Sequence, residues 1–121
     1  MVKLSVQELE AKLRKNPNDD DTLNKLGIIY SKSGEISKSI QVLEKAVSVN
    51  PNTAKYYNNL GNAYLLNNDL KRAKEYYQKA VQLEPNNPGF RMNLGNLYTL
   101  TEEKDKAEAE LKKAEELLSA P

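Results

Sequence analysis

The stretch AKYYNNLGNAYLLNNDLKRAKEYYQKAVQLEPNN, residues 54–87, is the central one of three copies of a 34-residue pattern. A leucine-glycine pair, a tyrosine three residues after the glycine and a proline before the copy recur at this spacing. These landmarks are Leu26-Gly27, Leu60-Gly61 and Leu94-Gly95, then Tyr30, Tyr64 and Tyr98, then Pro17, Pro51 and Pro85. One copy cannot bury its apolar face alone, so stacked neighbours must supply a continuous core.

Each copy holds two helical patterns joined by a short turn. The apolar periodicity predicts helices at about 20–32 and 36–49, 54–66 and 70–83, and 88–100 and 104–118. An earlier helix is expected to start at Ser5, which forms a capping box with Glu8, while Leu4 and Leu9 supply a hydrophobic staple. The chain is therefore expected to be all-α, with about seven helices.

The turns and the glycines carry further information. Gly34 and Asn68 tolerate a left-handed conformation at a helix end, whereas Glu102 in the matching place fits less well. A glycine inside a helix costs about 1 kcal/mol relative to alanine. Three such glycines in register therefore predict close contact with the second helix of each copy, which has matching small residues: Ser39, Ala73 and Ala107, then Ala46, Ala80 and Ala114.

Composition excludes several classes of function. Eighteen basic residues against seventeen acidic ones leave a net charge of +1, which gives no general electrostatic reason to bind nucleic acid or an anionic membrane. The chain has no Cys and no His, so disulfides and thiolate chemistry are excluded, and we expect no metal site and no cofactor. No apolar run approaches the roughly 20 residues that span a bilayer, and no signal peptide is recognised. We therefore expect a cytoplasmic protein.

The repeat resembles the tetratricopeptide repeat (TPR) family. The central copy reproduces the family signature with Leu60, Gly61, Tyr64, Ala73, Tyr77, Ala80 and Pro85. The resemblance implies a right-handed superhelical solenoid of antiparallel helix pairs in one domain. Its parts would be an N-terminal capping helix in residues 1–19 and three repeats in residues 20–53, 54–87 and 88–121.

Two departures from the family pattern concern the third repeat. The aromatic residue of the first helix, Tyr57 in the central copy, becomes Arg91 in the third. In the last helix, Glu110 and Glu115 replace residues that are apolar in earlier copies, such as Tyr76 and Val81. A terminal helix needs a polar outer face, so we interpret the last helix as a polar C-terminal cap.

The first helices are expected to line a concave groove, as the resemblance implies. Thirteen candidate binding residues lie away from the face of these helices that packs inward. They are Asn24, Lys25, Ile28, Lys32, Lys55, Asn58, Asn59, Asn62, Leu66, Met92, Asn93, Asn96 and Leu100. The apolar members, together with Leu65, predict an exposed patch of the kind that marks interaction sites. The alternative for Leu65 is burial by a neighbouring helix.

Asparagine is unusually frequent in the middle of these helices, although it is a mediocre helix former. A side-chain amide offers both a donor and an acceptor, as peptide backbone requires. Asn59 and Asn93 resemble the asparagine ladder of the TPR superhelix in O-linked N-acetylglucosamine transferases, which implies contact with peptide backbone, and Lys25 breaks this ladder. The alternative is that these amides satisfy neighbouring groups between repeats.

The known clamp of TPR co-chaperones for C-terminal carboxylates is not reproduced. The corresponding positions are Asn24, Ile28, Asn59, Gly89 and Asn93, of which only Asn59 matches the family residue. Lys25, Lys32 and Lys55 still give the groove some positive charge. The expected ligand is a protein or peptide segment, extended or helical, with polar or mildly acidic character.

These features predict a non-catalytic protein–protein interaction module that binds a peptide segment of a partner. The alternatives are a structural module that self-associates, with the chain a monomer or a weak oligomer, and a consensus-like designed scaffold without a natural ligand. An enzyme is not expected, because the usual bases and nucleophiles of acyl transfer and a glycine-rich phosphate loop are missing.

Overall fold

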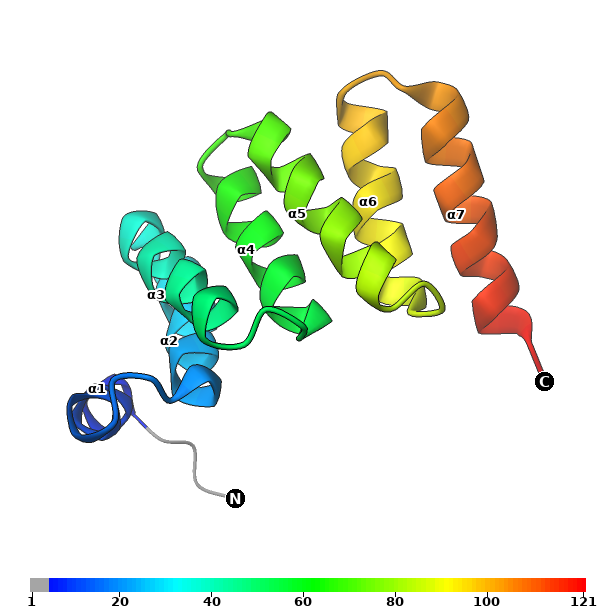
Figure 1. Ribbon diagram of the computed structural model, residues 1–121. Coiled ribbons are helices and arrows are strands. Elements are labelled where there is room, and N and C mark those ends of the chain that lie inside the picture. The colour runs from blue at the N-terminus through cyan, green and yellow to red at the C-terminus, as the bar shows by residue number, and fades with distance from the viewer. Residues whose placement is uncertain (1–4) are drawn as a thin grey trace.

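The computed structural model describes residues 5–121, which form seven α-helices and no strand (Figure 1). The predicted all-α architecture is confirmed, and the predicted helix ends agree with the observed ones to within about one residue. The helices are α1 (Val6–Lys15), α2 (Asp20–Lys32), α3 (Ile36–Val49), α4 (Ala54–Leu66), α5 (Leu70–Leu83), α6 (Pro88–Leu100) and α7 (Lys104–Ser119).

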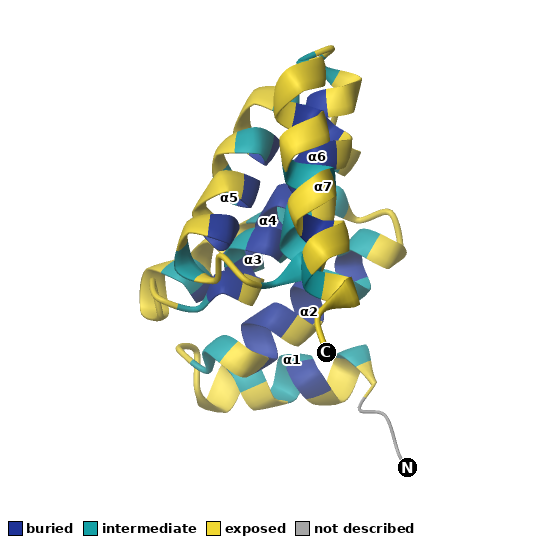
Figure 2. Cartoon of the chain, turned by 90° about the vertical axis from the view of Figure 1, so that its right-hand side faces the viewer, coloured by how far each residue is buried: buried dark blue, intermediate teal, exposed yellow. Residues whose placement is uncertain are grey.

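The helices form an open stack in which each pair contacts the next. The pairs α2–α3, α4–α5 and α6–α7 are antiparallel, and α1 and α7 lie at opposite ends of the stack (Figure 1). Figure 2 shows buried residues in stripes along the helix faces that meet, while the outer faces are exposed. Two first helices, α2 and α4, also contact each other directly.

The first helix begins as its sequence predicts. The hydroxyl of Ser5 accepts a hydrogen bond from the backbone N–H of Glu8 at 3.1 Å, and the Glu8 carboxylate accepts one from the Ser5 N–H at 3.4 Å. This confirms the capping box. The predicted staple involves Leu4, which lies outside the described residues.

A tyrosine hydrogen bond that recurs in every repeat shows that α1 corresponds to the second helix of a repeat. In each first helix the tyrosine after the glycine hydrogen-bonds to a side chain of the preceding helix, and these partners are themselves spaced by 34 residues. The bonds join Tyr30 to Glu10 (2.9 Å), Tyr64 to Glu44, and Gln78 to Tyr98 (2.9 Å). Since α1 supplies the same contact as α3 and α5, it stands where the second helix of a preceding repeat would stand.

The glycines inside the first helices allow the two helices of each pair to approach closely. A Cβ atom added to Gly61 would lie 2.6 Å from the Tyr77 ring, and one added to Gly95 would lie 2.8 Å from Leu111. The expected close contact is confirmed, but the side chain that faces each glycine is large rather than small. The small residue of the second helix lies one turn before this large side chain. In the first repeat it is Ser39, whose hydroxyl donates to the carbonyl of Gly27 at 2.7 Å.

The irregular residues of the third repeat form a matched pair. In the central repeat Tyr57 stacks on Tyr76, with 6.2 Å between ring centroids. At the same two positions of the third repeat, Arg91 forms an ion pair with Glu110 at 2.9 Å. Tyr57 and Arg91 each also donate to the carbonyl of the proline six residues earlier. The polar residue at position 110 therefore has two reasons: Glu110 binds Arg91, and it lies on the last helix, whose outer face is polar.

The turn inside each repeat uses one residue in the left-handed region. The φ angle is 81° at Gly34, 60° at Asn68 and 61° at Glu102. Glycine adopts this conformation without steric cost, whereas glutamate has a Cβ that meets the following carbonyl. The third turn is therefore the strained one, as the sequence indicates.

We expect Glu102→Gly to raise the free energy of unfolding by about 1 kcal/mol, because it removes this backbone strain. The change is measured by urea denaturation followed by circular dichroism. Gly34→Ala is the matched control with the opposite sign: no atom lies within 4 Å of its added Cβ, so only backbone strain is introduced. Equal or lower stability of the Glu102→Gly variant would contradict this account of the turn.

Candidate functional site

A hollow of about 340 Å³ lies between the first helices of the first two repeats. Both α2 and α4 supply its walls, and the buried Leu43 of α3 borders it. Five of its eight lining residues belong to the predicted set, namely Ile28, Lys32, Asn59, Asn62 and Leu66; the other three are Gly27, Ser31 and Leu43. The structure therefore brings together predicted residues from two repeats.

The rest of the predicted set is distributed differently. Five residues are exposed but lie outside this hollow: Lys25, Lys55, Met92, Asn96 and Leu100. Leu66, Leu100 and Met92 are the most exposed apolar residues of the first helices, at 59%, 60% and 41% of their surface. Leu65 is half-buried and packs against the core cluster, so burial is the correct alternative for that residue.

Two asparagines depart from the exposed position that we expected. Asn24 and Asn58 are only 6% and 9% exposed. The Asn59 amide nitrogen donates to the Asn24 carbonyl oxygen at 2.8 Å, and Asn93 donates to Asn58 in the same way at 2.9 Å. Buried polar groups need such partners. The burial has a physical reason, because each first helix also faces the first helix of the next repeat, and these two amides lie at that contact.

Asn62 is held by a residue of α5, the second helix of its own repeat. The hydroxyl of Tyr77 donates to the Asn62 carbonyl oxygen at 2.5 Å. Tyr77 is 2% exposed, and its burial raises the pKa of the phenol to about 12. The hydroxyl therefore stays protonated, and remains a donor, throughout the neutral range.

The charge around the hollow comes from one lysine. Lys32 is exposed and forms no ion pair within residues 5–121, whereas Lys25 pairs with Asp21 at 2.9 Å. Neither α4 nor α6 contains an acidic residue. The side of the array that α2 and α4 share therefore has a small excess of positive charge at one end of the hollow.

Sequence reasoning left Leu43, Tyr77 and Ser31 out of the candidate site. Leu43 and Tyr77 each follow the glycine of their repeat by 16 residues, and this spacing was a signal that they pack against the first helix. Ser31 follows Ile28 by one helical turn, so the two residues lie on the same side of α2. The bond from Tyr77 to Asn62 had no signal in the sequence, because it depends on how α4 and α5 cross.

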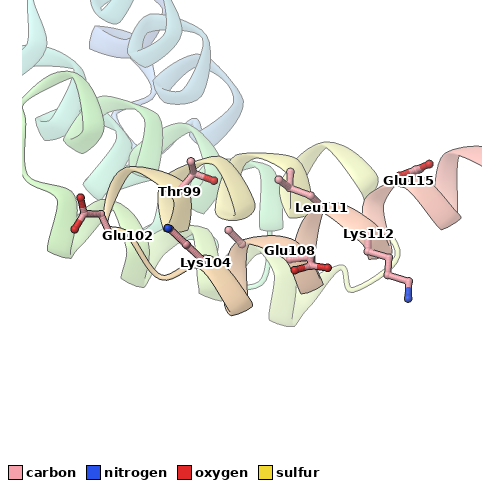
Figure 3. A pocket seen from close by; sticks show the side chains of 8 residues that line it. Thr99, Glu102, Lys104, Glu108, Leu111, Lys112 and Glu115 are labelled. Carbon is pink, nitrogen blue, oxygen red and sulfur yellow. The ribbon is translucent and has the colours of Figure 1, made fainter.

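A second hollow, of about 730 Å³, lies at the C-terminal end between α6 and α7 (Figure 3). Leu111 is half-buried there, whereas its counterparts Leu43 and Tyr77 are almost fully covered. The first helix of a following repeat covers those counterparts, and within the described residues no helix follows α7. The other lining residues are Thr99, Glu102, Lys104, Ala107, Glu108, Lys112 and Glu115.

The structure offers no sign of a metal centre or a membrane span in the part of the chain that it describes. No three acidic, histidine or cysteine side chains of residues 5–121 are grouped so that they could hold a metal ion. None of the helices over the same range combines the length and the hydrophobicity needed to cross a membrane.

Comparisons with known proteins identify the repeat. Family models described as tetratricopeptide repeat match residues 54–87 and 76–109, and one described as TPR repeat matches residues 29–68. No curated protein sequence matches the chain.

Solved structures of similar fold include a crystal structure of MamA, at 24% identity and a TM-score of 0.86, which covers 96% of this chain and 76% of that one. A second is residue 41 to the end of MamA from Desulfovibrio magneticus RS-1, at 28% identity and a TM-score of 0.86, which covers 93% of this chain and 63% of that one. A third is pilF of Pseudomonas aeruginosa, at 21% identity and a TM-score of 0.84, which covers 91% of this chain and 50% of that one. The chain spans less than two thirds of the length of the last two.

We expect Asn24→Ala to lower the free energy of unfolding by about 1–2 kcal/mol, because it leaves the half-buried amide of Asn59 without its acceptor. Asn96→Ala is the matched control, since Asn96 is an exposed helical asparagine whose side chain forms no hydrogen bond among the described residues. That change should stay within about 0.5 kcal/mol of the wild type. Urea denaturation of both variants measures the difference, and equal stabilities would show that the inter-repeat amide contact contributes nothing.

Proposed function

Because the chain belongs to the tetratricopeptide repeat family, we propose that it is a non-catalytic interaction module that binds a peptide segment of a partner protein. The segment lies along the side of the array formed by the first helices and is anchored in the hollow between α2 and α4. The observation that carries this proposal is the grouping of the exposed Leu66, the half-buried Ile28 and two hydrogen-bonded amides around that hollow.

Apolar exposure supports a binding role for this side. Leu66 is 59% exposed at the edge of the hollow, beside the half-buried Ile28. Apolar side chains gathered around a concavity, with a few polar groups among them, are typical of ligand sites. An apolar side chain of the segment would lose its contact with water here and bury Leu66 at the same time.

The chemistry of the lining residues argues against catalysis. Carboxylate, imidazole and thiol groups are missing from all eight, which leaves Lys32 as the single ionisable group. General acid–base catalysis needs a titratable group with a pKa near the working pH, and nucleophilic catalysis needs an activated nucleophile. Binding is the role that these residues can fill. We propose that the module acts in the cytoplasm.

The first test uses two exposed leucines. A displayed library of random 12-residue peptides is selected on the wild-type chain, and the dissociation constants of the selected peptides are measured by isothermal titration calorimetry. We expect Leu66→Asp to weaken binding at least tenfold, because it places a charge where an apolar contact forms. Leu118→Asp is the matched control, since Leu118 is 65% exposed on α7 and lies outside the hollow.

Both aspartate variants should keep the wild-type helicity by circular dichroism, because exposed leucines contribute little to the core. Failure to select any peptide on the wild type, or equal weakening by the two variants, would refute binding at this hollow.

The second test concerns the charge of the segment. We expect Lys32→Glu to weaken peptides with an acidic residue about three- to tenfold and to leave neutral peptides unchanged, because it replaces an attractive charge by a repulsive one. The same effect should shrink as salt is raised from about 50 mM to 500 mM, since exposed charges are screened. An affinity for acidic peptides that does not respond to Lys32→Glu would remove the charge from the proposal.

Self-association through the C-terminal end of the array is a second candidate function. The open hollow beside Leu111 and the 65% exposed Leu118 place apolar surface at that end. Sedimentation velocity over a range of concentrations tests this candidate. If the end faces associate, Leu118→Asp should abolish the concentration dependence while peptide binding is kept.

A further inference from the structure

The C-terminal hollow beside Leu111 repeats a surface that a helix covers elsewhere in the array. Leu43 and Tyr77, the counterparts of Leu111, are 0% and 2% exposed. The first helix of the next repeat lies against the helix of each: α4 contacts α3, and α6 contacts α5. Leu111 itself is half-buried in an open hollow (Figure 3). Because stacked repeats share one geometry, the occupant that fits this surface is an α-helix.

The interface between α5 and α6 shows which residues of a second helix face the first helix that covers it. Gln78 of α5 donates to the hydroxyl of Tyr98 in α6 at 2.9 Å. One turn earlier in α5, Lys74 forms an ion pair at 3.5 Å with Glu103, which follows α6 in the chain. One turn later, Val81 packs in a core cluster with apolar residues of α6. The contacts therefore run in opposite directions along the two helices.

The matching positions of α7 carry three charges that alternate in sign. They are Glu108, Lys112 and Glu115, in place of Lys74, Gln78 and Val81. All three line the hollow, are exposed and form no ion pair within residues 5–121 (Figure 3). A lysine only donates, so the group that faces Lys112 must accept, and a carboxylate also neutralises its charge. By the same reasoning, the two glutamates favour basic residues.

We propose that the hollow formed by α6 and α7 is a docking site for an amphipathic helix of a partner protein. This helix lies antiparallel to α7 with apolar side chains against Leu111 and an acidic residue against Lys112. A basic residue stands one turn away on either side of the acidic one, against Glu115 and Glu108. The surface is separate from the hollow between α2 and α4, so the inference does not rest on the peptide binding proposed above.

The packing and the charges argue against a second copy of this chain as the occupant. In a folded copy α2, α4 and α6 each pack against at least two other helices, so none of them is free to dock. Two α7 helices that met antiparallel about Leu111 would bring Glu108 of one copy close to Glu115 of the other. Like charges that face each other across an interface disfavour it.

A solvated end face makes a different prediction from a docking site. The last helix of an array needs a polar outer face for solubility, and any exposed charge serves that purpose. Charges with this role alone would not distinguish between helices of opposite charge order. Charges that recognise a helix would.

Two synthetic helical peptides of about 18 residues test the proposal. Both have the same leucine stripe; one carries Lys, Glu and Lys one turn apart beside the stripe, and the other carries Glu, Lys and Glu. Balancing residues on the far face give both peptides the same net charge. Dissociation constants are measured by fluorescence anisotropy at about 50 mM salt. We expect the wild-type chain to bind the Lys-Glu-Lys peptide about tenfold more tightly, with a smaller difference at about 500 mM salt.

Charge reversal on α7 tests the site. Lys112→Glu should weaken the Lys-Glu-Lys peptide about fivefold or more, and the triple variant Glu108→Lys/Lys112→Glu/Glu115→Lys should prefer the other peptide. Lys113→Glu is the matched control, since Lys113 is exposed on the same helix but lies outside the hollow. It should change affinity less than about twofold. The substituted residues are exposed, so circular dichroism should show wild-type helicity. In the wild type, peptide binding should shift the NMR methyl signals of Leu111.

Three results would overturn the proposal. The first is equal affinity for the two peptides, or no binding of either at about 1 mM. The second is loss of binding with Leu66→Asp but not with Lys112→Glu, which would move the helix to the hollow between α2 and α4. The third is self-association of the chain that Lys112→Glu abolishes and Lys113→Glu keeps, which would make a second copy the occupant. Peptides selected for the hollow between α2 and α4 are tested separately, so either proposal can fail without the other.

Discussion

The structure depends on one constraint, the close approach of the two helices of each pair at a glycine of the first helix. At Gly61 the ring of Tyr77 occupies the space where any other residue would have a Cβ atom. The same approach carries the tyrosine hydroxyl to the neighbouring Asn62, at the edge of the hollow. The packing that holds the pair together therefore also orients a group of the candidate site, so fold and site cannot be varied independently at this point.

Within this constraint, the repeats differ from one another at pairs of contacting positions rather than at single positions. The apolar Leu23 and Val42 of the first repeat become two stacked tyrosines in the second and an ion pair in the third, Arg91 with Glu110. The ion pair keeps both side chains largely covered, at 18% and 20% exposure. Each set fills the same space with a different interaction, which explains how a copy with an irregular sequence keeps regular geometry.

Much of the fold could be read from the sequence because its signals are local. A proline, a capping box and a glycine in a turn act on the few residues around them, and the helix ends follow. The exposure of Leu66 and the place of Ile28 at the hollow also follow from one helix face. The burial of Asn24 and Asn58 does not, because α2 and α4 each contact other helices besides the partner in their own repeat, and the sequence of one helix does not show which of its polar residues meets them. The bond between Tyr77 and Asn62 likewise depends on a crossing between helices.

The walls of the hollow belong to two different repeats, one to α2 and one to α4. Each repeat contacts only its neighbours, and the curvature of such a stack follows from the rotation between successive repeats. The width of the hollow and the curvature of the array are therefore one mechanical variable. A ligand in the hollow would contact both repeats, and a change in the angle between them would widen or narrow the space that it occupies.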